Sequence, residues 1–171
     1  MATLIAMSGL PGVGKTVLSR VLARRTGAVH LRVDTAEAAL QHSTLRITQA
    51  EDAGYRVLAG LAIDNLRLGL DVIADTVNPI ALTRQIWAEA AATAGADLLN
   101  VEVTCQDATR HRFRVEGRQS DLPGQTVPTW AAVQNRYFQL WWGAALSVDT
   151  GEATLEACAQ RIAAAMGGKT G

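Results

Sequence analysis

A glycine-rich loop, residues 9–16, is the feature that most constrains what this chain can fold into. It fits the pattern G-x-x-x-x-G-K-[ST], with Gly9 in the first position and Gly14-Lys15-Thr16 at the end. The preceding run, residues 3–8, is apolar and has the length of a strand. Residues 15–27 repeat apolar side chains at helical spacing and end at a glycine. A strand, this loop and a helix in that order form the setting in which the pattern binds phosphate.

The loop suits an anion for physical reasons. Glycines let backbone N–H groups surround a phosphate without a Cβ in the way, and the helix N-terminus adds a partial positive charge. Lys15 can reach the β- and γ-phosphates, and the Thr16 hydroxyl can bind Mg²⁺. We therefore predict ATP and Mg²⁺ as cofactors. The predicted nucleotide contacts within the loop and the first helical turn are Gly9, Gly12, Val13, Gly14, Lys15, Thr16 and Val17.

Strand-like and helical stretches alternate along the rest of the chain, which predicts a single α/β domain over residues 1–171. The further strand-like runs are residues 28–34, 71–76, 98–105 and 145–150. The further helical runs are residues 49–70, 78–95, 107–119, 129–142 and 152–166. Five strands that alternate with helices predict a parallel sheet covered on both faces. Ligands then bind at the carboxyl ends of the strands.

Composition narrows the possible partners. Sixteen basic residues balance sixteen acidic ones, so no net field favours nucleic acid or a membrane surface. Cys105 and Cys158 have no metal-site spacing and fit a reducing compartment. No signal-peptide pattern and no apolar run of about 18 residues occurs. We expect a cytoplasmic monomer or homodimer that acts on a small molecule.

Polar side chains follow the second and third strands. Asp34 ends one and Asp75 ends the other, with Asn78 shortly after. Beside a triphosphate, one carboxylate can accept a hydroxyl proton and another can orient the water on Mg²⁺ or hold the acceptor. Asp34 could instead cap the helix that begins "TAEAAL", and Asp75 could simply form a turn. We predict metal binding by Thr16 and Asp75, and acceptor binding by Asp34, Asp75, Asn78 and Arg84, although Arg84 could equally pair with a carboxylate.

Three arginines follow the fourth strand. Arg110, Arg114 and Arg118 recur every four residues and share one face of a helix. Guanidinium groups on one face can clamp phosphates and neutralise the charge that develops during transfer; the alternative is a solvated basic face. The segment continues into a loop rich in Gly and Pro, so we predict a mobile lid over residues 107–128.

Aromatic residues gather near the end of the chain, where they could stack on a base or a ring substrate but more often form core. They are Trp130, Tyr137, Phe138, Trp141 and Trp142. The histidines form no set of metal ligands. They are His30, His42 and His111.

Several of these stretches together resemble the small P-loop kinases. They are the phosphate loop, Asp34, "VIADTVNP", the arginine series and "SDLPG…PTW". The chain is most similar to predicted ATP-dependent kinases related to polynucleotide 5′-kinase, chloramphenicol phosphotransferase and the zeta-toxin kinases. The resemblance implies a P-loop nucleoside-triphosphate hydrolase fold with strand order 2-3-1-4-5. It implies Lys15 as a catalytic residue, Asp34 as the base and Arg110 and Arg114 as lid arginines, with Arg118 as a further candidate.

The function expected from these features is transfer of the γ-phosphate of ATP to a hydroxyl of a nucleoside-, sugar- or antibiotic-like acceptor. Shikimate kinases carry Asp-x-Asp where this chain has Arg32-Val33-Asp34, so shikimate is not the expected acceptor. The guanine-reading Asn-Lys-x-Asp element of GTPases is missing, and Thr76 stands where a ring-forming ATPase would place a glutamate. Two alternatives remain open: a polynucleotide 5′-hydroxyl kinase, and a regulatory module that binds nucleotide without catalysis.

Overall fold

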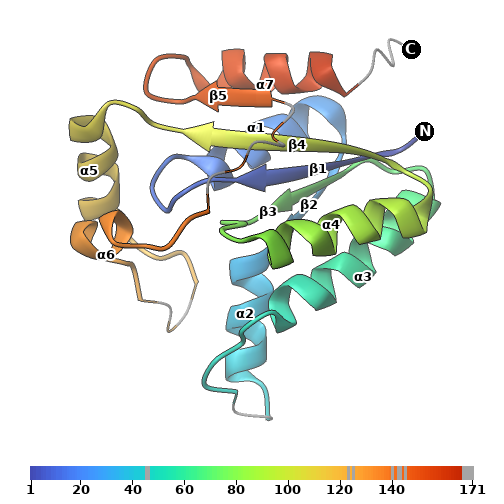
Figure 1. Ribbon diagram of the computed structural model, residues 1–171, viewed down its shortest axis with the longest axis horizontal. Coiled ribbons are helices and arrows are strands. Elements are labelled where there is room, and N and C mark those ends of the chain that lie inside the picture. The colour runs from blue at the N-terminus through green and yellow to red at the C-terminus, as the bar shows by residue number, and fades with distance from the viewer. Residues whose placement is uncertain are drawn as a thin grey trace.

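A five-stranded parallel sheet forms the centre of the computed structural model, with strand order β2-β3-β1-β4-β5 (Figure 1). The structure describes residues 1–44, 47–122, 124, 126–139, 141, 144 and 146–166. The strands are β1 (Thr3–Ser8), β2 (Val29–Arg32), β3 (Val72–Asp75), β4 (Asp97–Thr104) and β5 (Leu146–Asp149). The predicted fold class and strand order are confirmed.

Helices cover both faces of the sheet (Figure 1). They are α1 (Lys15–Thr26), α2 (Val33–His42), α3 (Ala53–Arg67), α4 (Ala81–Ala94), α5 (Ala108–Glu116), α6 (Trp130–Gln134) and α7 (Leu155–Ala165). The alternation of side chains along β1 divides the core in two. Leu4 and Ala6 face α3 and α4, where Trp87 is fully buried. Ile5 and Met7 pack in the second core, with α1 and α7.

Burial explains why the strand that leads into the phosphate loop is rigid. All six residues of β1 are buried, because helices lie on both of its faces and β3 and β4 flank it. Burying a large apolar side chain stabilises a fold by about 1.5–3 kcal/mol. The two cores therefore fix the end of β1, and with it the position of the loop that follows.

Two predicted boundaries are wrong. Strand β2 ends at Arg32 rather than at residue 34, so Asp34 lies in the first turn of α2 and Arg32 occupies the N-cap position. The helix predicted over 129–142 ends at Gln134. After Gln134 the chain does not continue as a helix, because Gln139 bonds to residues at the start of α4. Its N–H donates to the Pro79 carbonyl at 2.8 Å, and its Oε1 accepts from the Ala81 N–H at 2.7 Å.

Two predicted end residues lie outside the described residues. They are Trp142, the last residue of the predicted helix 129–142, and Ala145, the first residue of the predicted fifth strand. Within the described part of the chain, no helix combines the length and the apolar character needed to cross a bilayer.

Candidate active site

The phosphate loop lies at the carboxyl end of β1, and its glycines are required by its shape. Gly9 and Gly12 have φ of 145° and 86°, in the region that favours glycine. A Cβ at Gly9 would also collide with the Val103 carbonyl oxygen, and one at Gly12 with the Val115 side chain. The sequence pattern is therefore explained by close packing of the loop against β4 and α5.

Lys15 is the first residue of α1 and is buried, with 7% of its surface exposed. Its ammonium group donates to the Leu10 carbonyl at 2.9 Å. Burial lowers the pKa of Lys15 to about 8, although Asp75 and Asp34 act in the opposite direction. A cation that has lost its water gains strongly from an anionic ligand, so this side chain is suited to a phosphate.

A cavity of about 390 Å³, here called the central cavity, collects most of the residues predicted from the strand ends. Lys15, Thr16, Asp34 and Asp75 all line it. Arg118 lines it as well, from the segment that follows α5. Segments distant in the sequence thus meet at one edge of the sheet, as expected for the carboxyl ends of parallel strands.

Two further cavities adjoin the central one and differ in charge. The basic cavity, about 470 Å³, shares Lys15, Thr16 and Arg118 with it. The basic cavity is otherwise lined by charged groups on or near α1, β2 and α5: Arg20, Arg32, Arg114 and Asp121. The acidic cavity, about 520 Å³, shares Asp34 and other residues with the central cavity. Its charged groups are Asp34, Glu37, Glu51, Asp52 and Arg136.

Asp34 lies where the central and acidic cavities meet. Its Oδ2 is 3.4 Å from Arg32 Nη2 and 3.8 Å from Arg118 Nη2, and its side chain is 33% exposed. The carboxylate is therefore oriented by two guanidinium groups and still reachable from both cavities. Sequence reasoning identified this residue, although it placed it at a strand end.

Asp75 and Thr16 supply the oxygen atoms predicted to bind Mg²⁺. Both line the central cavity, and Asp75 Oδ2 is 3.1 Å from His30 Nε2. Carboxylate and hydroxyl oxygens suit Mg²⁺, which retains several waters and takes phosphate oxygens as ligands. Among the residues the structure describes, no group of three or more His, Cys, Asp or Glu could hold a metal. The Asp75 and Thr16 oxygens are of the type that Mg²⁺ prefers. Sequence reasoning missed His30, which reaches Asp75 from the neighbouring strand.

The predicted arginines differ in position. Arg114 donates to Thr150 Oγ1 at 2.8 Å and to the Thr150 carbonyl at 3.1 Å. The Thr150 hydroxyl in turn donates to the Val13 carbonyl at 2.6 Å, so Arg114 is tied to the phosphate loop. Arg110 is exposed and donates to the Gly151 carbonyl at 2.6 Å, outside the lining of the three cavities. Arg118, the less favoured candidate, lines two of them.

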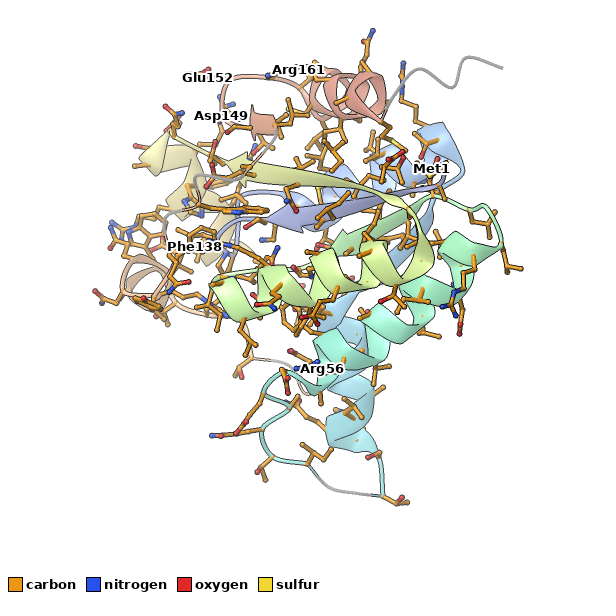
Figure 2. All side chains as sticks on the ribbon, turned by 45° about the vertical axis from the view of Figure 1, so that its right-hand side comes forward. Met1, Arg56, Phe138, Asp149, Glu152 and Arg161 are labelled. Carbon is orange, nitrogen blue, oxygen red and sulfur yellow. The ribbon has the colours of Figure 1, made fainter. Side chains whose placement is uncertain are left out.

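Asn78 and Arg84, predicted to contact an acceptor, line none of the three cavities. Asn78 is fully buried with a left-handed backbone, φ 53°, and its N–H donates to Tyr55 Oη at 3.1 Å. Arg84 donates to the carbonyls of Asn78 and Gln139, at 3.2 and 2.6 Å. Its guanidinium carbon also lies 5.5 Å from the ring centroid of Phe138. Figure 2 labels Phe138. Asn78 and Arg84 both make contacts within or next to the turn after β3, and their contact with an acceptor stays a prediction.

The start of α5 is docked on the phosphate loop. His111 is buried, and its Nε2 forms a 2.8 Å hydrogen bond with the Pro11 carbonyl. Its ring packs edge-to-face on Trp130, with the two ring centroids 5.1 Å apart. This explains one member of the aromatic cluster as packing. Trp141 stacks on the Arg84 guanidinium at 4.8 Å, whereas Tyr137 is exposed.

Sequence reasoning also missed Glu37, Arg136 and Asp121. Glu37 and Arg136 line both the central and the acidic cavities. Burial, followed by the charge of Asp34, raises the pKa of Glu37 to about 7. Its position three residues after Asp34 was the available signal, since that spacing places two side chains on one helical face. Arg136 and Asp121 lie in irregular segments and gave no such signal.

Solved structures with the same fold include kinases. The APS kinase of Mycobacterium tuberculosis, in complex with AMPPNP and APS, has a TM-score of 0.68 at 17% identity over 95% of this chain and 96% of that one. The tunicamycin resistance protein of Deinococcus radiodurans has a TM-score of 0.66 at 17% identity over 98% and 96%. A gluconokinase from Sinorhizobium meliloti has a TM-score of 0.64 at 15% identity over 96% and 91%. At these identities the likeness establishes the P-loop fold alone.

No curated protein sequence matches the chain significantly. A family model described as an AAA domain matches residues 4–136, from β1 through the phosphate loop and the arginines to Arg136. Because this match spans more than half of the sequence, the chain belongs to that AAA domain family.

Proposed function

We propose that this protein is an ATP-dependent phosphotransferase that moves the γ-phosphate of ATP to a hydroxyl group of a small molecule. One observation carries the proposal: the central cavity, with Lys15 and Asp34 in its wall, shares Lys15 with the basic cavity and Asp34 with the acidic one. A polyanionic donor suits the basic cavity, and a hydroxyl acceptor beside a carboxylate suits the acidic one. The kinases of the same fold support this assignment.

In this proposal the triphosphate lies on the phosphate loop and extends into the basic cavity. Lys15, Arg114 and Arg118 stabilise the charge that develops on the transferred group, which is the main contribution a protein makes to phosphoryl transfer. Thr16 and Asp75 would hold Mg²⁺, which when bound neutralises phosphate charge. His30, hydrogen-bonded to Asp75 at 3.1 Å, would fix the orientation of that carboxylate.

Asp34 is the proposed general base. Its carboxylate accepts the proton of the acceptor hydroxyl, while Arg32 and Arg118 hold it toward the central cavity. Position supports this role better than it does for any other predicted carboxylate, because Asp34 lines both the cavity with Lys15 and the cavity beyond it.

We further propose that residues 107–128 form a lid within a single domain. The anchoring of α5 through His111 implies that the mobile part begins after Glu116. Arg118 belongs to this part, so closing of the lid would bring its guanidinium to the phosphates and exclude water.

The proposal is tested by an ATP-consumption screen over hydroxyl compounds, with mass spectrometry of any product. We expect at least one acceptor to accelerate ATP consumption and to gain a phosphate, and Lys15→Ala to abolish both effects. ATP binding without acceptor-dependent turnover would instead favour the regulatory module. Turnover only with nucleic-acid 5′ ends would favour the polynucleotide kinase.

A further inference from the structure

The acidic cavity has no assigned ligand, and it adjoins the proposed base. It holds about 520 Å³ and is walled partly by apolar side chains, including Val33, Ile80 and Leu82. Its volume suits a small ligand rather than a polymer. If the proposed function is correct, an acceptor whose hydroxyl reaches Asp34 from the central cavity places the remainder of its structure here.

Carboxyl groups outnumber cationic side chains in the wall of this cavity. Four carboxyl groups line it, and among the described residues Arg136 is the one cationic side chain in its wall. Asp34 is close to Arg32 and Arg118, and Asp52 pairs at 2.9 Å with Arg56, which is labelled at the start of α3 in Figure 2. Within the part of the chain that the structure describes, no ion pair within 4 Å is formed by Glu37 or Glu51.

Glu37 is held in a defined place. A Cβ on Gly54 would lie only 2.6 Å from Glu37 Cγ, so the glycine at the start of α3 makes room for this side chain. Glu37 follows Asp34 by three residues on α2, and side chains at that spacing lie about 5 Å apart on one helical face. An acceptor whose hydroxyl meets Asp34 would therefore present a group about 5 Å away to Glu37.

We infer that Glu37 is a specificity-determining residue which binds an ammonium group of the acceptor, so that the acceptor is a polyhydroxylated amine rather than an anion. This inference rests on the proposed function. An ammonium group would gain a charge-assisted hydrogen bond from the Glu37 carboxylate and would be attracted by Asp34, Glu51 and Asp52. A carboxylate or phosphate on the acceptor would be repelled by the same groups; Arg136 in the cavity wall, and the arginines next to Asp34 and Asp52, offset only part of this repulsion.

The binding test uses three six-carbon polyols that differ mainly in charge: glucamine, an amine; sorbitol, which is neutral; and gluconate, an anion. Calorimetric titration in the presence of Mg²⁺ and AMPPNP measures the affinity of each for the whole chain. We expect glucamine to bind about tenfold more tightly than gluconate, as one charge-assisted contact allows. Gluconate binding as tightly as glucamine, or no detectable binding of glucamine, overturns the inference.

Variants assign the preference to its residue. Glu37→Gln keeps the shape of the side chain and should remove most of the preference for glucamine. Glu89→Gln, on the exposed face of α4 and bonded to Gln85, is the matched control and should retain it. Arg136→Gln guards against misfolding of the Glu37 variant. Arg136→Gln should bind glucamine at least as tightly as the wild type does. If instead the wild type binds gluconate more tightly than glucamine and Arg136→Gln loses that gluconate binding, the cavity binds anions and the inference falls.

The pH dependence gives a readout that a purely structural role would not produce. Glu37 lines the acidic cavity with Asp34 of its own helix, with Glu51, Asp52 and Tyr55 at the start of α3, and with Arg136. It also lines the central cavity with Lys15, Asp75 and Arg118. Because the pKa of Glu37 is raised to about 7, its carboxylate forms as the pH rises from 6 to 8. Glucamine affinity should rise more steeply over this range in the wild type than in Glu37→Gln, since the loss of charge on Lys15, whose pKa is lowered to about 8, is common to both proteins. A rise of the same size in both proteins would contradict the assignment.

Turnover separates this inference from the proposed function. If a neutral or anionic acceptor is phosphorylated and amines are not, the kinase proposal stands and the inference falls. If no acceptor of any charge is phosphorylated, the kinase proposal falls, while the charge preference measured by titration is unaffected.

Discussion

The two cavities beside the central cavity differ in the elements that supply their charges. In the basic cavity, arginines come from α1, from the end of β2 and from α5 with the segment after it. In the acidic cavity, carboxylates come from the first turns of α2 and the entry to α3. Lys15 lies between them, buried and with its pKa lowered to about 8. The comparison shows that a chain with no net charge can present two strongly charged ligand surfaces.

This separation of charge gives a direction to the proposed reaction. Two unit charges 4 Å apart interact by about 4 kcal/mol at an effective dielectric constant of 20. A triphosphate is therefore attracted to the basic side and repelled from the acidic one. An acceptor that enters the acidic side meets the γ-phosphate only near Lys15 and Asp34, where transfer would occur.

The largest expected effect comes from removing the base on the acidic side. Asp34→Asn keeps the size of the side chain but cannot accept a proton, so kcat should fall by about 10²–10⁴-fold. ATP affinity should change little, because Asp34 does not line the basic cavity. Steady-state kinetics at saturating acceptor, with ATP binding measured by calorimetry, checks both. An unchanged kcat would show that Asp34 has only a structural role in the first turn of α2.

A smaller loss is expected when the charge between the two cavities is removed. Lys15→Ala should lower the rate of phosphoryl transfer by about 10²–10³-fold, since one preorganised contact to the transferring group is lost. The fold should persist, because the hydrogen bond that the Lys15 ammonium makes within the described residues, to the Leu10 carbonyl, lies inside the phosphate loop. Circular dichroism serves as the control for folding. A folded variant with near-normal turnover would refute the assignment of the phosphate loop.

Arg118 and Arg110 test whether a position beside the basic cavity decides the contribution of an arginine to catalysis. Arg118 lines both the central and the basic cavities, whereas Arg110 faces the Gly151 carbonyl. We expect Arg118→Gln to lower kcat by about tenfold or more and Arg110→Gln to lower it by less than about threefold. Parallel kinetics on the two variants measures the ratio. The opposite order would show that α5 moves in the liganded state and brings Arg110 to the phosphates.

The fold was predictable because its signals are local. The glycine pattern and the buried runs before Ser8 and Asp75 fixed the strands and the loop, and parallel order followed from their alternation with helices. The boundary at Asp34 was missed because β-branched and apolar residues continue from β2 into the first turn of α2. The length of α6 was missed because its end depends on hydrogen bonds from Gln139 to Pro79 and Ala81.

The candidate site was predictable only where side chains follow strands. Asp34 and Asp75, predicted in this way, line the central cavity, whereas Asn78 and Arg84, predicted by the same rule, make contacts at the turn after β3. Which of these four side chains reach the cavity depends on contacts with Tyr55 and Gln139, and the spacing of residues in the sequence does not predict those contacts. Arg136 and Asp121 come from irregular segments that tertiary contacts bring to the cavities, so pattern reasoning had no basis for choosing them.

The smallest expected effect concerns the contact that holds the proposed lid against the basic cavity. Asp121 accepts from Arg20 at 2.8 Å and from Arg32 at 2.9 Å, and these hydrogen bonds lower its pKa to about 2. Because that pKa lies below the ordinary value, the stabilisation is present above about pH 4 and is lost as the pH falls toward 2. The carboxylate is half-exposed, so Asp121→Asn should destabilise the fold by less than about 1 kcal/mol at neutral pH.

Asp121→Asn should change the hydrogen exchange of the proposed lid more than it changes the free energy of unfolding of the whole protein. Hydrogen exchange measured by mass spectrometry should show faster exchange after Glu116 than within α5, which His111 anchors to the phosphate loop. Asp121→Asn should increase that contrast, and added salt should reduce the difference between variant and wild type, since the ion pair is exposed. ATP, Mg²⁺ and an acceptor should protect residues 107–128 in both proteins, because bound phosphates would replace Asp121 as the partner of the arginines. If this segment is already protected in the empty protein, or if ligands leave its exchange unchanged, the arginines form a fixed wall of the basic cavity and no lid closes over it.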